Sequence, residues 1–144
     1  MDREVNVLAA WVYLSLSFSG GCFAADPFLR IPEGDRAVLS RVAHEYRLTP
    51  EQRRLLFAIR MAERGGPGRE MGVLTPAAMR YKGDHAKSLD LQARWCAGTI
   101  RARYTGDLEA FAARYAPRDV ANDPKGLNRN WVPNVRFFLQ KGSN

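Results

Sequence analysis

The segment TPEQRRLLFAIRMAE, Thr49 to Glu63, begins with a clear helix signal. Thr49 is a favourable N-cap, Pro50 suits the first helical position, and Gln52 completes a T-x-x-Q capping box. The glycine-rich sequence GGPG at 65–68 ends the helical pattern. The segment therefore predicts a helix over 50–63.

The segments on either side of this helix have the same character. Apolar residues at helical spacing predict helices at 35–46, 89–104 and 131–140, a shorter helix from Asp107 to Tyr115, and a short turn of helix from Thr75-Pro76 through Met79. No segment shows a convincing period of two. We therefore predict an all-α fold, with one compact helical domain over residues 26–144 and short connections.

Composition narrows the class of protein further. The chain has 144 residues, of which 46% are hydrophobic, and 22 Lys and Arg against 15 Asp and Glu give a net charge of +7. This length suits one domain, and the apolar content argues against disorder. Two cysteines and two histidines, far apart in sequence, argue against a disulfide scaffold or a metal cluster. We therefore expect a small basic domain without a metal or cofactor.

The N-terminus carries an apolar run, VNVLAAWVYLSLSFSGGCFAA at 5–25, that is too broken by Ser and Gly for a spanning helix. Small residues at Cys22 and Ala24 fit cleavage after Ala24 or Ala25. We therefore predict a signal peptide over 1–25, export to the periplasm or medium, and a mature form with no membrane span.

Two alternatives to a cleaved signal remain open at the N-terminus. Asp2 and Glu4 outweigh Arg3 where a signal peptide usually carries positive charge, which favours a buried N-terminal helix. A lipoprotein attached through Cys22 ranks lower, because Ser19 stands where Leu is usual in the lipoprotein box. Cleavage leaves Cys96 as the remaining cysteine, and we expect it to be a small buried apolar residue.

Glu63 is the most informative residue of the chain. It follows Leu56 by seven residues and Ile59 by four, which places it on the apolar face of its helix. Burial and the negative end of the helix dipole both raise the pKa of a carboxyl group at this position. A raised pKa suits a general acid that works near neutral pH. The alternative is a surface ion pair between Glu63 and Arg60 or Arg64.

Short motifs surround Glu63 and recur later in the chain. The sequences AIRMAERG at 58–65 and GREMGVL at 68–74 resemble the lysozyme-like superfamily, in particular lytic transglycosylases and related wall hydrolases. In these proteins a helix ends in the catalytic Glu, and a glycine-containing loop leads into a segment that contacts substrate. AFAARYAP at 110–117, Asn122-Asp123 and WVPNV at 131–135 resemble the tail of such domains. The resemblance implies a lysozyme-like fold with Glu63 as the catalytic acid.

A glycan cleft needs flat apolar surfaces for sugar faces and polar groups for hydroxyls. Candidates for the first are Trp95, Tyr104, Tyr115 and Trp131, of which about half are expected to be core residues only. Gln92, Asn122 and Asn134 could donate and accept hydrogen bonds, although polar residues beside Pro and Gly often form turns. The substrate-binding residues that we predict are Glu70, Gln92, Trp95, Tyr115, Asn122 and Trp131.

The mechanism depends on whether a second carboxylate faces Glu63, because glycoside hydrolysis ordinarily uses two. Glu70, Asp84 and Asp90 are candidates, but none has a spacing that requires the role. With Glu63 alone, the resemblance to transglycosylases implies attack by the sugar's own hydroxyl and an anhydro product. Water activated on the opposite face is the alternative. The single-acid scheme is favoured because no paired-carboxylate motif is present.

These observations predict a peptidoglycan-cleaving glycosidase, a lytic transglycosylase or muramidase, that binds glycan strands as a monomer and binds no nucleic acid. A basic nucleic-acid-binding protein is one alternative, because 35–46 and 50–63 resemble a helix-turn-helix in outline, with arginines at 53, 54, 60 and 64. Against it, the predicted export separates the protein from DNA. A catalytically inactive wall-binding domain is the other alternative, since dispersed positive charge favours adhesion to an anionic wall.

Overall fold

The computed structural model describes residues 26–73, 76–121 and 123–141. The predicted signal peptide, Thr75 and Asn122 lie outside the described residues. The elements in chain order are η1 (Pro27–Arg30), α1 (Glu33–Glu45), α2 (Pro50–Glu63), α3 (Pro76–Arg80), α4 (His85–Arg103), α5 (Leu108–Tyr115), η2 (Leu127–Asn130) and α6 (Trp131–Lys141). No strand occurs in the described ranges, so the predicted all-α fold is confirmed.

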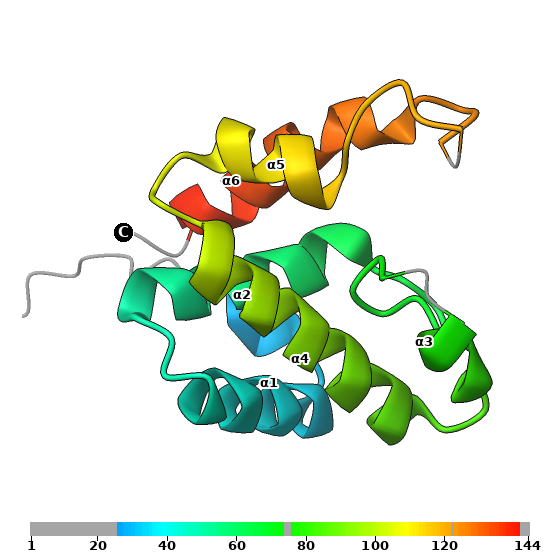
Figure 1. The fold of residues 1–144 in the computed structure, drawn as a ribbon. Helices are drawn as coiled ribbons and strands as arrows, with labels where there is room; N and C mark the ends of the chain where they lie inside the picture. Colours follow the sequence, from blue (N-terminus) through cyan, green and yellow to red (C-terminus); the bar gives the residue numbers. More distant parts are fainter. Residues whose placement is uncertain (1–25, 74–75, 122, 142–144) are drawn as a thin grey trace, which may run out of the picture.

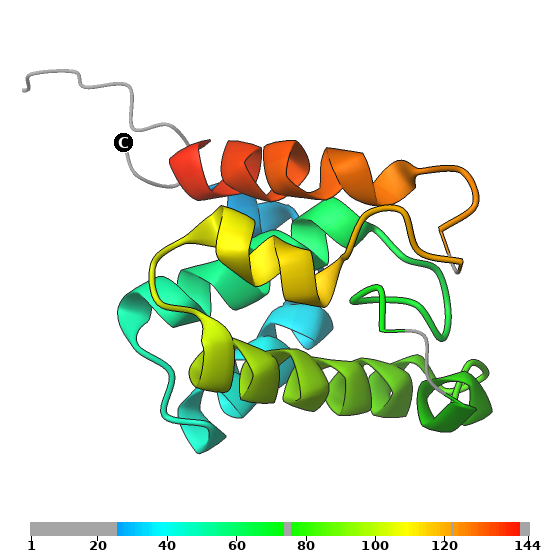
Figure 2. The same ribbon diagram turned by 45° about the horizontal axis from the view of Figure 1, so that its top comes forward.

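Helix α2 is the centre of the molecule. It packs against α1 and α4 on one side and against α6 on the other, and α5 lies beside α6 (Figures 1 and 2). Six of its residues are buried, namely Leu55, Leu56, Phe57, Ala58, Ile59 and Met61. Because three helices surround it, both the position and the direction of its last residue, Glu63, are fixed by the core.

The predicted capping box of α2 is confirmed. The Thr49 hydroxyl accepts the N–H of Gln52 at 3.2 Å, and the Gln52 side chain accepts the N–H of Thr49 at 3.1 Å. The helix ends at Glu63, because Arg64 adopts a left-handed conformation with φ 45°. The chain then leaves the helix as a loop over residues 64–73, which we call the acid loop.

Helix α4 begins at His85, four residues earlier than the apolar pattern indicates. The Asp84 carboxylate accepts the N–H of Lys87 at 3.1 Å and caps the helix there. The predicted apolar face is confirmed, with Leu89, Ala93, Ala97 and Ile100 all buried. The start of α4 could not be predicted from the apolar pattern, because its first turn is polar and the pattern indicates only the apolar positions.

Cys96 is a buried free thiol, as expected from the sequence. Burial raises its pKa to about 12, so it stays protonated near neutral pH and does not serve as a nucleophile. None of the described helices combines the length and the apolar character needed to cross a membrane.

Candidate active site

A cleft of about 720 Å³ lies between the acid loop, the outer face of α4 and the chain around the C-terminal end of α5. Glu63, Gly72 and Val73 line it from the end of α2 and the acid loop, and Trp95 and Thr99 from α4. Tyr115, Asp123 and Asn128 are among the residues that line it from the C-terminal third of the chain. Segments far apart in the sequence therefore meet at Glu63.

Among the described residues, one donor reaches the side chain of Glu63, and it belongs to a buried residue. The indole N–H of Trp131, the first residue of α6, donates to Glu63 Oε1 at 2.8 Å. Burial raises the pKa of Glu63, and the hydrogen bond from Trp131 lowers it by less. Oε2 makes no hydrogen bond with any described residue, so this oxygen is available to carry the proton of the neutral carboxyl group.

The surface ion pair considered for Glu63 does not form. Arg60 binds Asp35 instead, with Nη2 at 2.9 Å and Nε at 3.2 Å from Asp35 Oδ2. Arg64 forms no ion pair within the described residues, and its side chain is exposed. No described cation therefore lies at hydrogen-bonding distance from Glu63 to stabilise its charged form, and burial sets the direction of its pKa shift.

Gly72 closes the acid loop directly against Glu63. Its φ is +71°, and a Cβ atom added to it would lie 2.5 Å from Glu63 Cδ and 2.6 Å from Oε2. Both features favour glycine, because a side chain is strained at this φ and would also displace the carboxylate end of Glu63. The backbone of the acid loop at Gly72 thus lies against the Glu63 carboxyl group.

The two tryptophans predicted to bind substrate lie in different places. Trp95 is 53% exposed on α4 and lines the cleft, so its indole face is available to a ligand. Trp131 is only 6% exposed and packs against Tyr115 and Phe111, with ring centroids 5.3 and 6.0 Å away. The prediction for Trp131 is therefore corrected. Its indole N–H bonds Glu63, and its buried ring has no exposed face on which a sugar could stack.

Tyr115 lines the cleft and also supports the acid loop. Its ring stacks on Phe111, with centroids 5.5 Å apart, and its hydroxyl donates to the Met71 carbonyl at 2.8 Å. Burial raises the pKa of Tyr115 well above its ordinary value, so the hydroxyl keeps the proton that it donates. Tyr104, the fourth aromatic candidate, donates to Glu51 at 2.9 Å outside the cleft.

Glu70 and Gln92 do not line the cleft, and their predicted contact with substrate is corrected. Both side chains are fully buried, and the Gln92 side-chain amide donates to Glu70 Oε2. Gln92 Oε1 accepts the N–H of Met71 at 2.9 Å. All of the side-chain polar atoms of Glu70 and Gln92 are hydrogen-bonded within the protein. These two residues therefore hold the acid loop in place and do not contact a ligand.

The other carboxylates considered as partners of Glu63 are engaged elsewhere. Asp84 caps α4, and Asp90 pairs with Arg41 at 2.8 Å and with Arg94 at 2.9 Å. Neither lines the cleft. Among the residues that do, the one further carboxylate is Asp123, which the sequence prediction missed. Its two oxygens accept the N–H groups of Leu127 and Asn128, both at 2.8 Å.

Two basic residues of the cleft, Arg69 and Arg114, were also missed. Helical periodicity identifies neither, because one lies in the acid loop and the other on the exposed side of α5. Asp123 had a local signal, since an Asp that precedes Gly126 and Asn128 is typical of a side-chain-capped turn. The predicted residue Asn122 lies outside the described residues.

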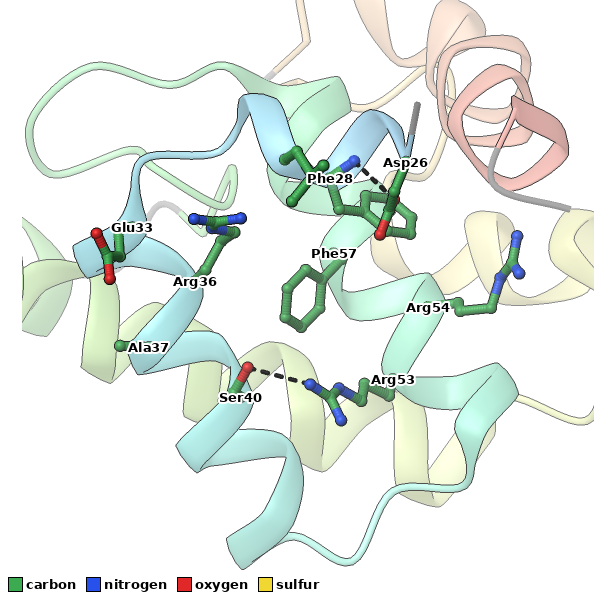
Figure 3. Close-up of a pocket in the computed structure, with 10 residues that line it drawn as sticks. Asp26, Phe28, Glu33, Arg36, Ala37, Ser40, Arg53, Arg54 and Phe57 are labelled. Carbon is green, nitrogen blue, oxygen red and sulfur yellow. Dashed lines mark hydrogen bonds between the residues drawn. The ribbon is translucent and has the colours of Figure 1, made fainter. Parts of the chain in front are cut away.

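A second pocket, of about 550 Å³, lies between η1, α1 and α2 (Figure 3). Its lining includes Phe28, Phe57 and Arg53, and the Arg53 guanidinium lies 5.6 Å from the Phe57 ring centroid and donates to Ser40. Its two carboxylates, Asp26 and Glu33, are exposed. The described lining of this pocket has no partly buried acid comparable to Glu63 in the cleft.

The fold and the site together define an all-α domain with a partly buried carboxyl group, Glu63, in an open cleft. Within the described ranges, no three His, Cys, Asp or Glu side chains are grouped so that they could hold a metal ion. Comparisons with protein-family models, with curated proteins and with solved structures give no match.

Proposed function

We propose that the protein is a glycosidase that cleaves peptidoglycan strands, with Glu63 as its general acid. The observation that carries this proposal is the environment of Glu63, a partly buried carboxyl group with a raised pKa that lines a cleft and accepts the indole N–H of Trp131 through Oε1. General acids of glycosidases need this state, because they must still hold a proton at the pH at which the glycosidic oxygen leaves.

In the proposed reaction, Glu63 first donates its proton to the glycosidic oxygen, and the bond from that oxygen to the sugar's anomeric carbon breaks. The Glu63 carboxylate then takes a proton from a hydroxyl of the same sugar, whose oxygen bonds to the anomeric carbon. The product is an anhydro sugar, and Glu63 ends protonated for the next cycle. One carboxylate suffices, which agrees with a cleft whose other described carboxylate, Asp123, is bound by backbone N–H groups.

The walls of the cleft suit a glycan. Trp95 offers an exposed indole face, on which the apolar face of a sugar ring can stack. Arg69 and Arg114 add exposed guanidinium groups that can donate to hydroxyl or carboxylate oxygens. The proposal includes export through the N-terminal segment, which would bring a basic protein to an anionic cell wall.

The position of α2 favours the glycosidase over a nucleic-acid-binding protein. A recognition helix must be exposed to enter a groove, whereas α2 is surrounded by α1, α4 and α6. Two of its arginines make contacts within the protein: Arg60 binds Asp35, and Arg54 donates to the Leu139 carbonyl at 2.8 Å. These two guanidinium groups are therefore poorly suited to contact phosphates.

The test is incubation of the purified protein with purified peptidoglycan, followed by mass spectrometry of the soluble fragments. We expect fragments with anhydro ends. Fragments with reducing ends would still support a glycosidase, but one in which water, rather than a hydroxyl of the sugar, attacks the anomeric carbon. A protein that pelleted with the wall and released no fragment would contradict the proposal and identify a wall-binding domain, and a salt-sensitive shift of DNA would favour the nucleic-acid alternative.

A further inference from the structure

Four charged side chains form an ionic cluster that joins α1, α2, α4 and the acid loop, and none of them lines the cleft. Asp35 on α1 binds Arg60 of α2 through Oδ2 and His85 of α4 through Oδ1, at 2.9 and 2.7 Å. The other ring nitrogen of His85, Nδ1, lies 3.1 Å from Oε1 of Glu70 in the acid loop. We call these four residues the ionic cluster.

The geometry of the ionic cluster requires a protonated His85. Ionised carboxylates only accept hydrogen bonds, so each ring nitrogen of His85 must carry a hydrogen to bond its partner. The cluster is then electrically balanced, with two carboxylates against one guanidinium and one imidazolium. The charged groups nearest in sequence on α4, Asp84 and Lys87, pair with each other at 3.1 Å. The two carboxylates of the cluster raise the pKa of His85, with the Asp35 hydrogen bond as the largest cause.

Glu70 is the member of the cluster that belongs to the acid loop. Its two oxygens accept hydrogen bonds from Gly68 N–H at 3.2 Å, from the Ser88 hydroxyl at 2.7 Å, from Gln92 and from His85. Burial by itself raises the pKa of Glu70, but these hydrogen bonds outweigh burial and the net pKa is lowered. The loop is therefore tied to α4 through an ionised, fully bonded carboxylate.

The residues that follow Glu70 connect it along the backbone to the proposed catalytic acid, Glu63. The next residue, Met71, has its N–H bonded to Gln92 and its carbonyl bonded to Tyr115. The residue after that, Gly72, lies against the Glu63 carboxylate. Three consecutive residues thus connect the ionic cluster to the acid, and each is held by a specific contact.

We propose that Glu70, with protonated His85 as its counter-ion, is a positioning residue that fixes the acid loop and so keeps Gly72 seated against Glu63. The catalytic meaning of this role rests on the proposed function of Glu63. His85 is 49% exposed, so its proton exchanges directly with solvent. Loss of that proton leaves two buried carboxylates with Arg60 as the single cation of the cluster, which weakens the tie between the loop and α4.

The decisive test is a titration of Glu63 by carbon-13 NMR in wild type and in His85→Gln. The Glu63 signal is identified by its absence in Glu63→Gln. In His85→Gln we expect its midpoint to fall toward that of an exposed glutamate, about 4.3, because the loosened loop admits water. The Trp131 indole N–H signal should move as well. His44→Gln, which replaces the one other histidine of the chain, on the exposed side of α1, should change neither signal.

Circular dichroism checks the fold of each variant. If His85→Gln does not fold, Ser88→Ala decides, because it removes one of the four donors to Glu70 and creates no unpaired charge. An unchanged Glu63 midpoint together with an unchanged indole signal, in whichever of the two variants is folded, would overturn the proposal.

An activity measurement separates the two proposals. If wild type cleaves peptidoglycan, His85→Gln should lower kcat on the order of 10²-fold and leave KM nearly unchanged, since His85 does not line the cleft. A loss confined to KM would contradict the positioning role. If wild type cleaves nothing but the NMR signals of Glu63 and Trp131 still respond to His85→Gln, the coupling stands and the proposed function fails.

Discussion

At the scale of the residue, the pKa of Glu63 results from two opposed effects with different sources. Burial by the acid loop and the surrounding core raises the pKa, and the hydrogen bond from Trp131 lowers it. The two effects can be separated by mutation, because the indole N–H belongs to one atom, whereas burial is distributed over many.

Trp131→Phe removes the hydrogen bond and keeps an aromatic ring in the core. We predict that the pKa of Glu63 rises further, since the charged form loses the one donor found among the described residues. The alkaline limb of the pH–rate profile should then move to higher pH, and a carbon-13 titration should show the same shift. Trp95→Phe is the control, because Trp95 lines the cleft without bonding Glu63. A downward shift in Trp131→Phe would show that the indole matters through packing.

Gly72→Ala tests the contact between the acid loop and the acid. A left-handed φ costs an alanine about 1–2 kcal/mol, and at Gly72 the new methyl group also collides with Glu63. Gly106→Ala is the matched control, since its φ is +97° and no heavy atom lies within 4 Å of the Cβ position. We predict a larger loss in the free energy of unfolding for Gly72→Ala by urea denaturation. Equal losses in the free energy of unfolding for the two variants would mean that the contact between Gly72 and Glu63 does not constrain the acid loop.

At the scale of the element, the start of α2, with its full capping box and Pro50, was predictable, whereas the start of α4, capped by Asp84 alone, was not. Thr49, Pro50 and Gln52 define the start of α2 within four residues, and both capping bonds form. The start of α4 escaped detection, because its cap at Asp84 precedes a polar turn. A helix start can thus be predicted from the local sequence only where a clear capping signal accompanies the apolar pattern of the helix.

Thr49→Ala should lower the free energy of unfolding by about 1 kcal/mol, because the Gln52 N–H loses its acceptor at the start of the central helix. Urea denaturation followed by circular dichroism measures the change. Thr105→Ala is the control, since Thr105 is exposed between α4 and α5 and bonds no described residue. A change no larger than that of the control would show that the capping box adds nothing to stability.

The acid loop shows why part of the site could not be predicted. The position of Glu63 at the end of α2 could be predicted, because its apolar spacing and the helix stop after it are local features. Glu70 and Gln92 were assigned to substrate because nothing local reveals that they bond each other across 22 positions. The partner of Glu63, Trp131, lies 68 positions away. Contacts at such separations depend on the packed core and leave no periodic signal.

At the scale of the whole molecule, the shifted pKa values of Glu63, His85 and Glu70 each make stability depend on pH. The pKa of Glu63 is raised, so the folded state keeps a proton that the unfolded chain loses near about 4.3, and stability falls as the pH rises from there through the folded pKa. His85, also raised, adds a second decline above about 6.5. The pKa of Glu70 is lowered, so its contribution is present above about 4.3 and is lost as the pH falls.

Urea denaturation at a series of pH values should therefore show a decline in wild type that Glu63→Gln lacks in part. The difference in free energy of unfolding between the two proteins should begin to change near pH 4.3 and level off above the folded pKa of Glu63. Parallel curves for the two proteins across this range would mean that Glu63 titrates alike in the folded and unfolded states.

The central claim is that Glu63 supplies the proton that breaks the glycan strand, and the rate of strand cleavage by Glu63→Gln tests it most directly. Glutamine keeps the size of the side chain and an acceptor for the Trp131 N–H but has no transferable proton. Glu33→Gln, at an exposed position outside the cleft, is the matched control. The account predicts that Glu63→Gln cleaves peptidoglycan about 100-fold more slowly than wild type or worse, while Glu33→Gln cleaves at the wild-type rate. A folded Glu63→Gln protein that cleaves as fast as wild type would contradict it.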